Sequence, residues 1–203
     1  MGFLSSLFGP SKDEIWSQVA NEINGEFIDG GFWNRDQLIY DHGEWTIVLD
    51  TFSRGSGKNS RTYTRMRAPF INKDDFQFQI YREGIFSPLG KWLGGQDIII
   101  GDQYFDDEFI IKGNDEEKIK LLLHDERIKD LLSFQPDVDI KIDPDDAWIF
   151  KQYPDGVDAL YYECRGTITT KEDLKNLFEL FCLILNRLVK IDSAYEDDPG
   201  VTL

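Results

Sequence analysis

Residues 61–68 read Arg-Thr-Tyr-Thr-Arg-Met-Arg-Ala, and residues 76–82 read Phe-Gln-Phe-Gln-Ile-Tyr-Arg. Two kinds of side chain alternate along both stretches, which is the pattern of a β-strand with two different faces. Two more strands are predicted upstream, over residues 37–40 and 45–52, because residues 41–44 have the composition of a hairpin turn. The links between these four strands are too short for the crossovers that parallel strands require, so the sequence predicts an antiparallel meander.

Helices are predicted before and after this meander in the sequence. Ser11 and Glu14 have the spacing of a capping box in front of an apolar stripe, and Asn24-Gly25 supplies a left-handed helix end. A helical pair is predicted from a cap at Asn114, with a restart at Asp125. The last helix is predicted to start from a cap at Thr169 and to run to residue 191. Its second half is apolar on nearly every face, so we expect it in a core or in a subunit interface.

These elements predict an α+β protein, with antiparallel meanders, an N-terminal helix, a central helical pair and a long apolar C-terminal helix. Further strands are expected over residues 138–142, 147–152 and 159–165. A chain of 203 residues can form one large domain, and no proline-rich or low-complexity linker marks a boundary. The alternative is two subregions, residues 11–83 and 97–192. Residues 193–203 are expected to form an acidic tail, disordered around residues 196–200.

The composition excludes some classes of function. A formal net charge of −16 argues against nucleic acid as a partner, since phosphate neutralisation needs clustered Lys and Arg. No stretch is long and apolar enough for a membrane span. Phe3, Leu4, Leu7 and Phe8 leave a weak N-terminal contact with a membrane surface as an alternative to a frayed or packed terminus; Gly2 and Ser6 also match the loose myristoylation pattern. The two cysteines, Cys164 and Cys182, are expected to be buried thiols in a reducing compartment, hence a cytoplasmic location.

One region has the opposite charge to the rest of the chain. Residues 54–82 contain seven basic and two acidic side chains, a local charge of +5. Arg61, Arg65 and Arg67 occupy alternate positions and therefore share one face of the predicted strand. Either these arginines pair with the protein's own carboxylates, or they form a patch for an anionic ligand or for the acidic face of another protein or copy.

An acidic group is the second candidate site. Asp102, Asp106, Asp107 and Glu108 lie within seven residues, and in an extended segment Asp106 and Glu108 would share a face. Paired carboxylates can perform acid–base chemistry or hold a metal ion, although such groups also arise by chance in an acidic protein. Sequence patterns for phosphate loops, EF-hands and transition-metal sites each fail at a required position, so no cofactor and no metal are predicted.

The stretch Gly95-Gln-Asp-Ile98, followed by Gly101-Asp102, Phe105-Asp106, Phe109 and Ile111-Lys-Gly-Asn114, resembles a family of uncharacterised bacterial proteins. The resemblance covers about 50 residues and implies a bacterial, cytoplasmic protein. It implies no activity. It directs attention to a ligand site built from Trp92, Asp102 and Asp106, against the alternative that Asp102 caps or bridges locally.

The sequence therefore predicts a non-enzymatic binding or assembly module. Its contact surface would be the basic strand face or the apolar last helix, and its partner another copy of the chain or an acidic protein. Two alternatives stay open: a metal-dependent or acid–base hydrolase that uses the Asp102–Glu108 carboxylates, and a protein that binds a small anion.

Overall fold

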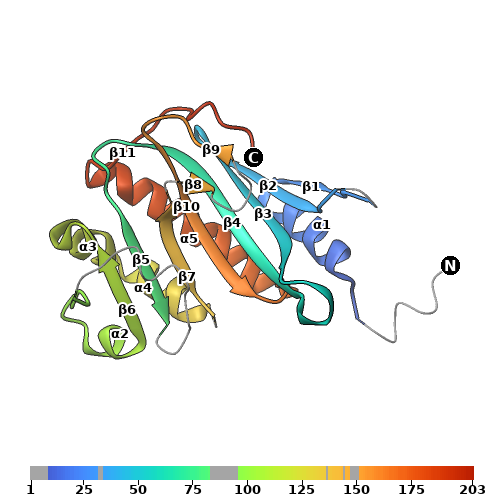
Figure 1. Cartoon of the computed structure of the whole chain (residues 1–203), viewed down its shortest axis with the longest axis horizontal. Helices are drawn as coiled ribbons and strands as arrows, with labels where there is room; N and C mark the ends of the chain where they lie inside the picture. The colour runs from blue at the N-terminus through green and yellow to red at the C-terminus, as the bar shows by residue number, and fades with distance from the viewer. Residues whose placement is uncertain (1–8, 32–33, 83–95, 136, 144, 147–150) are drawn as a thin grey trace.

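The computed structural model of the chain describes residues 9–31, 34–82, 96–135, 137–143, 145–146 and 151–203. It confirms the α+β class (Figure 1). The helices are α1 (Lys12–Ile23), α2 (Gln103–Glu108), α3 (Glu116–Leu123), α4 (Glu126–Phe134) and α5 (Lys171–Lys190). The strands are β1 (Glu26–Ile28), β2 (Gln37–His42), β3 (Trp45–Arg54), β4 (Arg61–Asn72), β5 (Phe78–Arg82), β6 (Phe109–Gly113), β7 (Asp139–Asp143), β8 (Asp145–Asp146), β9 (Lys151–Gln152), β10 (Val157–Arg165) and β11 (Ala194–Tyr195).

One antiparallel sheet holds all of these strands except β8 and β9, which pair with each other. Its order is β1-β2-β3-β4-β10-β7-β5-β6, and β11 pairs with β4. The meander is confirmed for β2, β3 and β4, but β5 is not the neighbour of β4. The nine residues of β10 pair along β4 instead, so that β10 and β7 lie between β4 and β5.

Helix α1 has the ends that the sequence predicts. The Ser11 Oγ accepts the Glu14 N–H at 3.2 Å, and the Glu14 carboxylate accepts the Ser11 N–H at 2.8 Å. Asn24 closes the helix in the left-handed region, at φ 58°. Trp16 is fully buried and donates its indole N–H to the Ile168 carbonyl, which ties α1 to the chain just before α5.

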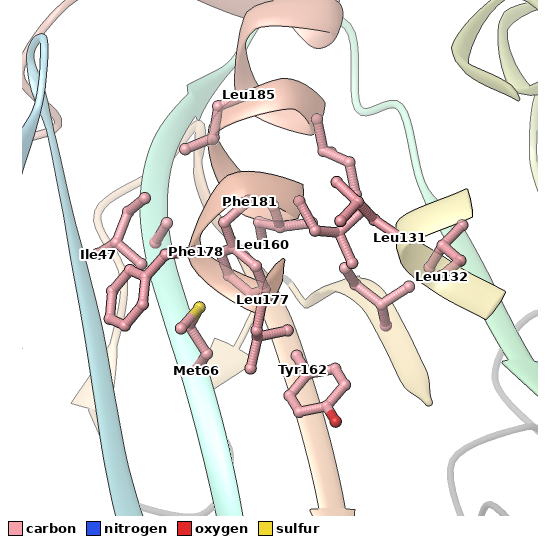
Figure 2. Close-up of a cluster of buried hydrophobic side chains, with 14 of the residues drawn as sticks. Ile47, Met66, Leu131, Leu132, Leu160, Tyr162, Leu177, Phe178, Phe181 and Leu185 are labelled. Carbon is pink, nitrogen blue, oxygen red and sulfur yellow. The ribbon is translucent and has the colours of Figure 1, made fainter. Parts of the chain in front are cut away.

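Helix α5 is the centre of the core. Figure 1 shows it behind the sheet, and Figure 2 shows its Leu177, Phe178 and Phe181 among side chains of the sheet and of α4. The buried positions of α5 are Leu174, Leu177, Phe178, Leu180, Phe181, Ile184, Leu185 and Leu188. They recur at helical spacing and meet the even-numbered side chains of β4 and β10, including Met66 and Leu160. Of the two expected places for this helix, the core is therefore the one observed.

Several local predictions differ from the structure. Residues 103–108 form a helix and not an extended segment, because the Asp102 carboxylate accepts the Phe105 N–H as an N-cap. The caps of α3 and α5 are Asp115 and Thr170, each one residue later than predicted. Within the strand expected over 147–152, residues 147–150 lie outside the described part of the chain. On either side of residues 196–200, where disorder is expected, the acidic tail makes contacts: Ala194 and Tyr195 form β11 and pair with β4, and Val201 and Leu203 pack on a small apolar cluster that includes Val157.

Candidate functional site

The predicted basic strand face is buried. The guanidinium of Arg65 donates to both oxygens of Asp50, with Nε–Oδ1 at 2.6 Å and Nη2–Oδ2 at 2.8 Å. Arg67 donates to the same carboxylate at 3.1 Å. Exposed fractions of 1% for Arg65 and 2% for Arg67 and Asp50 show that this ion pair lies away from water. Among the interpretations of these arginines, the geometry favours pairing with the protein's own carboxylates.

Neighbouring strands extend this charged row on the sheet face opposite α5. Arg54 on β3 makes two hydrogen bonds to Glu163 on β10, at 2.9 and 3.0 Å, and the Tyr161 hydroxyl donates to the same carboxylate. Lys141 and Asp143 pair on β7, and Gln79 on β5 donates to Asp139. We call this row the polar sheet face; its members are Asp50, Arg54, Arg65, Arg67, Gln79, Asp139, Lys141, Asp143, Tyr161 and Glu163. Burial of the Tyr161 ring raises the pKa of its hydroxyl, so it stays protonated.

Arg61 does not join this row. It is exposed at the start of β4, four residues before Arg65, which corresponds to about 13 Å along an extended strand. Arg61, Arg65 and Arg67 therefore do not converge on one ligand position. The exposed part of the predicted basic strand face is therefore the hairpin between β3 and β4.

That hairpin is an exposed basic end of the molecule. Lys58 and Arg61 are exposed on it, and Arg165 is exposed at the end of the adjacent strand β10. No acidic residue occurs between Asp50 and Asp74. At the base of the hairpin, the Arg54 guanidinium stacks on the rings of Phe52 and Tyr63.

The turn of this hairpin depends on glycine. Gly55 has φ +102°, a left-handed conformation, and a Cβ at this position would approach the Asn59 carbonyl oxygen to 2.6 Å. Residues 57–59 then form a single 3₁₀ turn that presents Lys58 to solvent. The glycines of residues 55–58, where the phosphate-loop pattern fails, are therefore explained by a tight turn.

The carboxylates of the second candidate site point to separate partners. Asp102 caps α2 and forms an ion pair with Lys129 at 2.5 Å, and this bond lowers the pKa of Asp102. Asp106 accepts the backbone N–H groups of Ile100 and Gly101, both at 3.0 Å. Glu108 pairs with Arg82. Each of these three carboxylates therefore makes a local contact, as in the alternative in which Asp102 caps or bridges locally. Trp92, the third residue of the predicted ligand site with Asp102 and Asp106, lies outside the described residues.

Arg82 organises a partly buried polar corner at the edge of the core. Its Nη2 donates to the carbonyl oxygens of Ser133 and Gln135, so it satisfies backbone acceptors at the end of α4 while it neutralises Glu108. Its guanidinium stacks on the Phe109 ring at 5.0 Å. This arginine, which the sequence analysis counted only as charge, fixes the end of α2 to the end of α4.

The two cysteines are free thiols. Burial raises the pKa of both, to about 11 for Cys182, which keeps them protonated and poorly nucleophilic. Within the described ranges, no group of three or more His, Cys, Asp or Glu side chains could hold a metal ion. The same part of the chain contains no helix that is long and apolar enough to cross a membrane.

Comparisons with known proteins add little to this geometry. No protein-family model matches the chain, and a search of curated proteins finds no match. The resemblance to an uncharacterised bacterial family therefore stays a prediction. Among solved structures, the mycobacterial trehalose monomycolate transport factor A, TtfA, aligns with 87% of this chain and 94% of its own. Its sequence identity is 7% and the TM-score is 0.49, which supports no inference about this chain.

Proposed function

We propose that the protein is a non-enzymatic binding module that contacts an acidic partner through the β3–β4 hairpin. The observation that carries this proposal is the exposed group Lys58, Arg61 and Arg165 at one end of an otherwise acidic chain. At physiological ionic strength, charges interact over a Debye length of about 8 Å, so a partner that reaches this end is attracted by the local cations more than it is repelled by distant carboxylates.

The packing around the hairpin supports a role in binding. Arg54 is held by Glu163 and by two aromatic rings, so the base of the hairpin is rigid while its turn extends into solvent. A preorganised charged surface loses less entropy on association than a mobile one. The acidic partner is another protein or a second copy of the chain, and a cytoplasmic location, in keeping with two free thiols, is part of the proposal.

The test is a charge reversal with a matched control. Lys58→Glu/Arg61→Glu removes the hairpin cations, and Arg35→Glu/Lys190→Glu makes the same change of net charge at two exposed positions elsewhere. A fluorescein-labelled oligo-glutamate peptide serves as the acidic probe in anisotropy titrations at low salt. We expect the hairpin variant to bind about tenfold more weakly than the wild type, and the control to keep most of its affinity.

Sedimentation velocity of the protein alone separates the two kinds of partner. If self-association is present and the hairpin variant abolishes it, the acidic partner is a second copy. The proposal fails if the wild type does not bind the acidic probe, or if both variants lose affinity equally, since the effect would then reflect net charge and not the hairpin.

A further inference from the structure

Large apolar side chains are exposed on the outer side of α2 and α4. Tyr104 on α2 is 73% exposed, Phe134 at the end of α4 is 59% exposed, and Ile99, in the segment before α2, is also 59% exposed. The described residues contain six exposed large apolar side chains, and half of them lie on these neighbouring elements. Scattered exposed apolar residues are ordinary, whereas a group of them on one surface indicates an interaction site.

Ion pairs join these elements into one surface. The buried Lys129 of α4 binds both Asp102, at the start of α2, and Glu126, at the start of α4. Arg82 joins the opposite ends of the two helices. The Asp106 carboxylate holds the backbone of residues 100 and 101 against α2, which places Ile99 beside it. These contacts therefore hold together the elements that carry the three apolar side chains.

The charges among them are negative. On α4, Glu126, Asp130 and Phe134 follow at intervals of four residues and share a solvent face. On α2, Tyr104 and Asp107 are exposed three residues apart, opposite the buried Phe105. Within the part of the chain that the structure describes, neither Asp107 nor Asp130 forms an ion pair. Residues 97–134 contain eleven acidic and five basic side chains, a formal charge of −6.

The basic residues closest to this surface are already engaged. Lys129 is buried beneath it and bound to Asp102 and Glu126, and Arg127 is bound to Glu179 on α5. The result is an acidic surface that carries exposed aromatic side chains. The basic β3–β4 hairpin lies at the other side of the molecule (Figure 1). We name it the α2–α4 face and define it by Ile99, Tyr104, Asp107, Glu126, Asp130 and Phe134.

We propose that the α2–α4 face binds a basic amphipathic segment of another protein, in which apolar side chains are flanked by Lys and Arg. Buried aromatic anchors contribute most of the affinity of such contacts, and complementary charge sets orientation and association rate. The net charge of −16 adds long-range attraction for a cationic segment. Nucleic acid and anionic lipid surfaces carry the wrong charge for this face, and a second copy of the chain is disfavoured by repulsion. This surface is separate from the hairpin, so it goes beyond the function proposed above.

A short labelled peptide of Leu and Lys in amphipathic helical order tests the proposal by anisotropy. We expect binding that weakens with salt, and a loss of affinity of about tenfold or more in Tyr104→Ala/Phe134→Ala and in Asp107→Asn/Asp130→Asn, whose change of net charge equals that of the control below. The matched control is Leu121→Ala/Glu117→Lys on α3, where an exposed apolar residue and an exposed carboxylate lie outside the face. The control should bind the peptide within about twofold of the wild type. Lys58→Glu/Arg61→Glu should not weaken peptide binding, so that a failure at the hairpin and a failure here are distinguishable.

Three outcomes would overturn the proposal. The first is equal binding of a Leu/Lys peptide with the same composition in scrambled, non-amphipathic order. The second is an equal loss in the α3 control, which would assign the effect to net charge. The third is a concentration-dependent oligomer of the wild type that Tyr104→Ala/Phe134→Ala converts to a monomer, because the occupant would then be a second copy. Circular dichroism of each variant before titration excludes unfolding as the cause of a loss.

Discussion

The two faces of the central sheet are built from the same strands but bury different kinds of side chain. On the face toward α5, Met66, Ala68 and Leu160 are fully buried among apolar neighbours. On the other face, Arg65 and Arg67 are just as buried but are held by Asp50. Along β4 the two kinds of side chain alternate residue by residue. Apolar burial is favourable without a specific partner, whereas a buried charge is tolerated only where its partner lies in the right place.

Leu49 and Asp50 are consecutive residues of β3 that belong to opposite faces, so they allow a direct comparison. Asp50→Ala should lower the free energy of unfolding by about 3–5 kcal/mol, because it removes the carboxylate that two buried arginines share. Leu49→Ala should cost about 2–4 kcal/mol through a cavity in the core. Urea denaturation at neutral pH measures both. A loss below about 1 kcal/mol for Asp50→Ala would show that other contacts hold the arginines.

A triple substitution sharpens the same comparison. Asp50→Leu/Arg65→Met/Arg67→Leu replaces the charged group by apolar side chains, and its stability should lie within about 1 kcal/mol of the wild type, since buried ion pairs contribute little over well-packed apolar groups. The matched variant Arg65→Met/Arg67→Leu, which leaves the Asp50 carboxylate without these donors, should be clearly less stable than the triple. If the triple is as unstable as Asp50→Ala, the ion pair is needed for the packing of this face and the comparison between the two faces no longer holds.

The sequence predicts helices and strands better than it predicts which of them pair with each other, and these residues show the reason. The cap at Ser11 and the alternation in β4 depend on near neighbours in the chain, so both are visible in the sequence. The place of β10 beside β4 depends on residues about a hundred positions apart, for example Arg54 and Glu163. The sequence therefore indicates internal pairing as one possibility for Arg65 and Arg67 but does not identify Asp50 as the partner. A hint was present, because Asp50 is a charged residue inside an apolar predicted strand.

The α2–α4 face was missed for a related reason. Tyr104 and Phe134 are ordinary aromatic residues in the sequence, and an aromatic residue is more often buried than exposed. Reading residues 102–108 as extended also placed Asp106 and Glu108 on one face, whereas in α2 they bind different partners. Only the position of Tyr104 on α2, on a different side of the helix from the buried Phe105, reveals its exposure.

The smallest expected effect on the free energy of unfolding comes from an exposed ion pair, which contrasts with the buried ion pair of Asp50. Arg127 on α4 donates to both oxygens of Glu179 on α5, at 2.8 and 2.7 Å, and each side chain is nearly half exposed. Glu179→Gln should therefore lower the free energy of unfolding by only about 0.5 kcal/mol at neutral pH. The bond to Arg127 lowers the pKa of Glu179 in the folded protein.

The sign of the pH dependence follows from that shift. A carboxyl with a lowered pKa contributes its stability above the unfolded value of about 4.3 and loses it as the pH falls through the folded value. The difference between the wild type and Glu179→Gln should thus be present at neutral pH, decrease as the pH falls below the unfolded pKa, and vanish once the pH is below the lowered folded pKa. Glu44→Gln, at an exposed carboxylate without an ion pair among the described residues, is the control and should show no such change. A difference between the wild type and Glu179→Gln that persists in acid would mean that this side chain stabilises the α4–α5 contact by packing and not by charge. Its contribution to stability would then resemble that of the apolar face of the sheet and not that of the polar face.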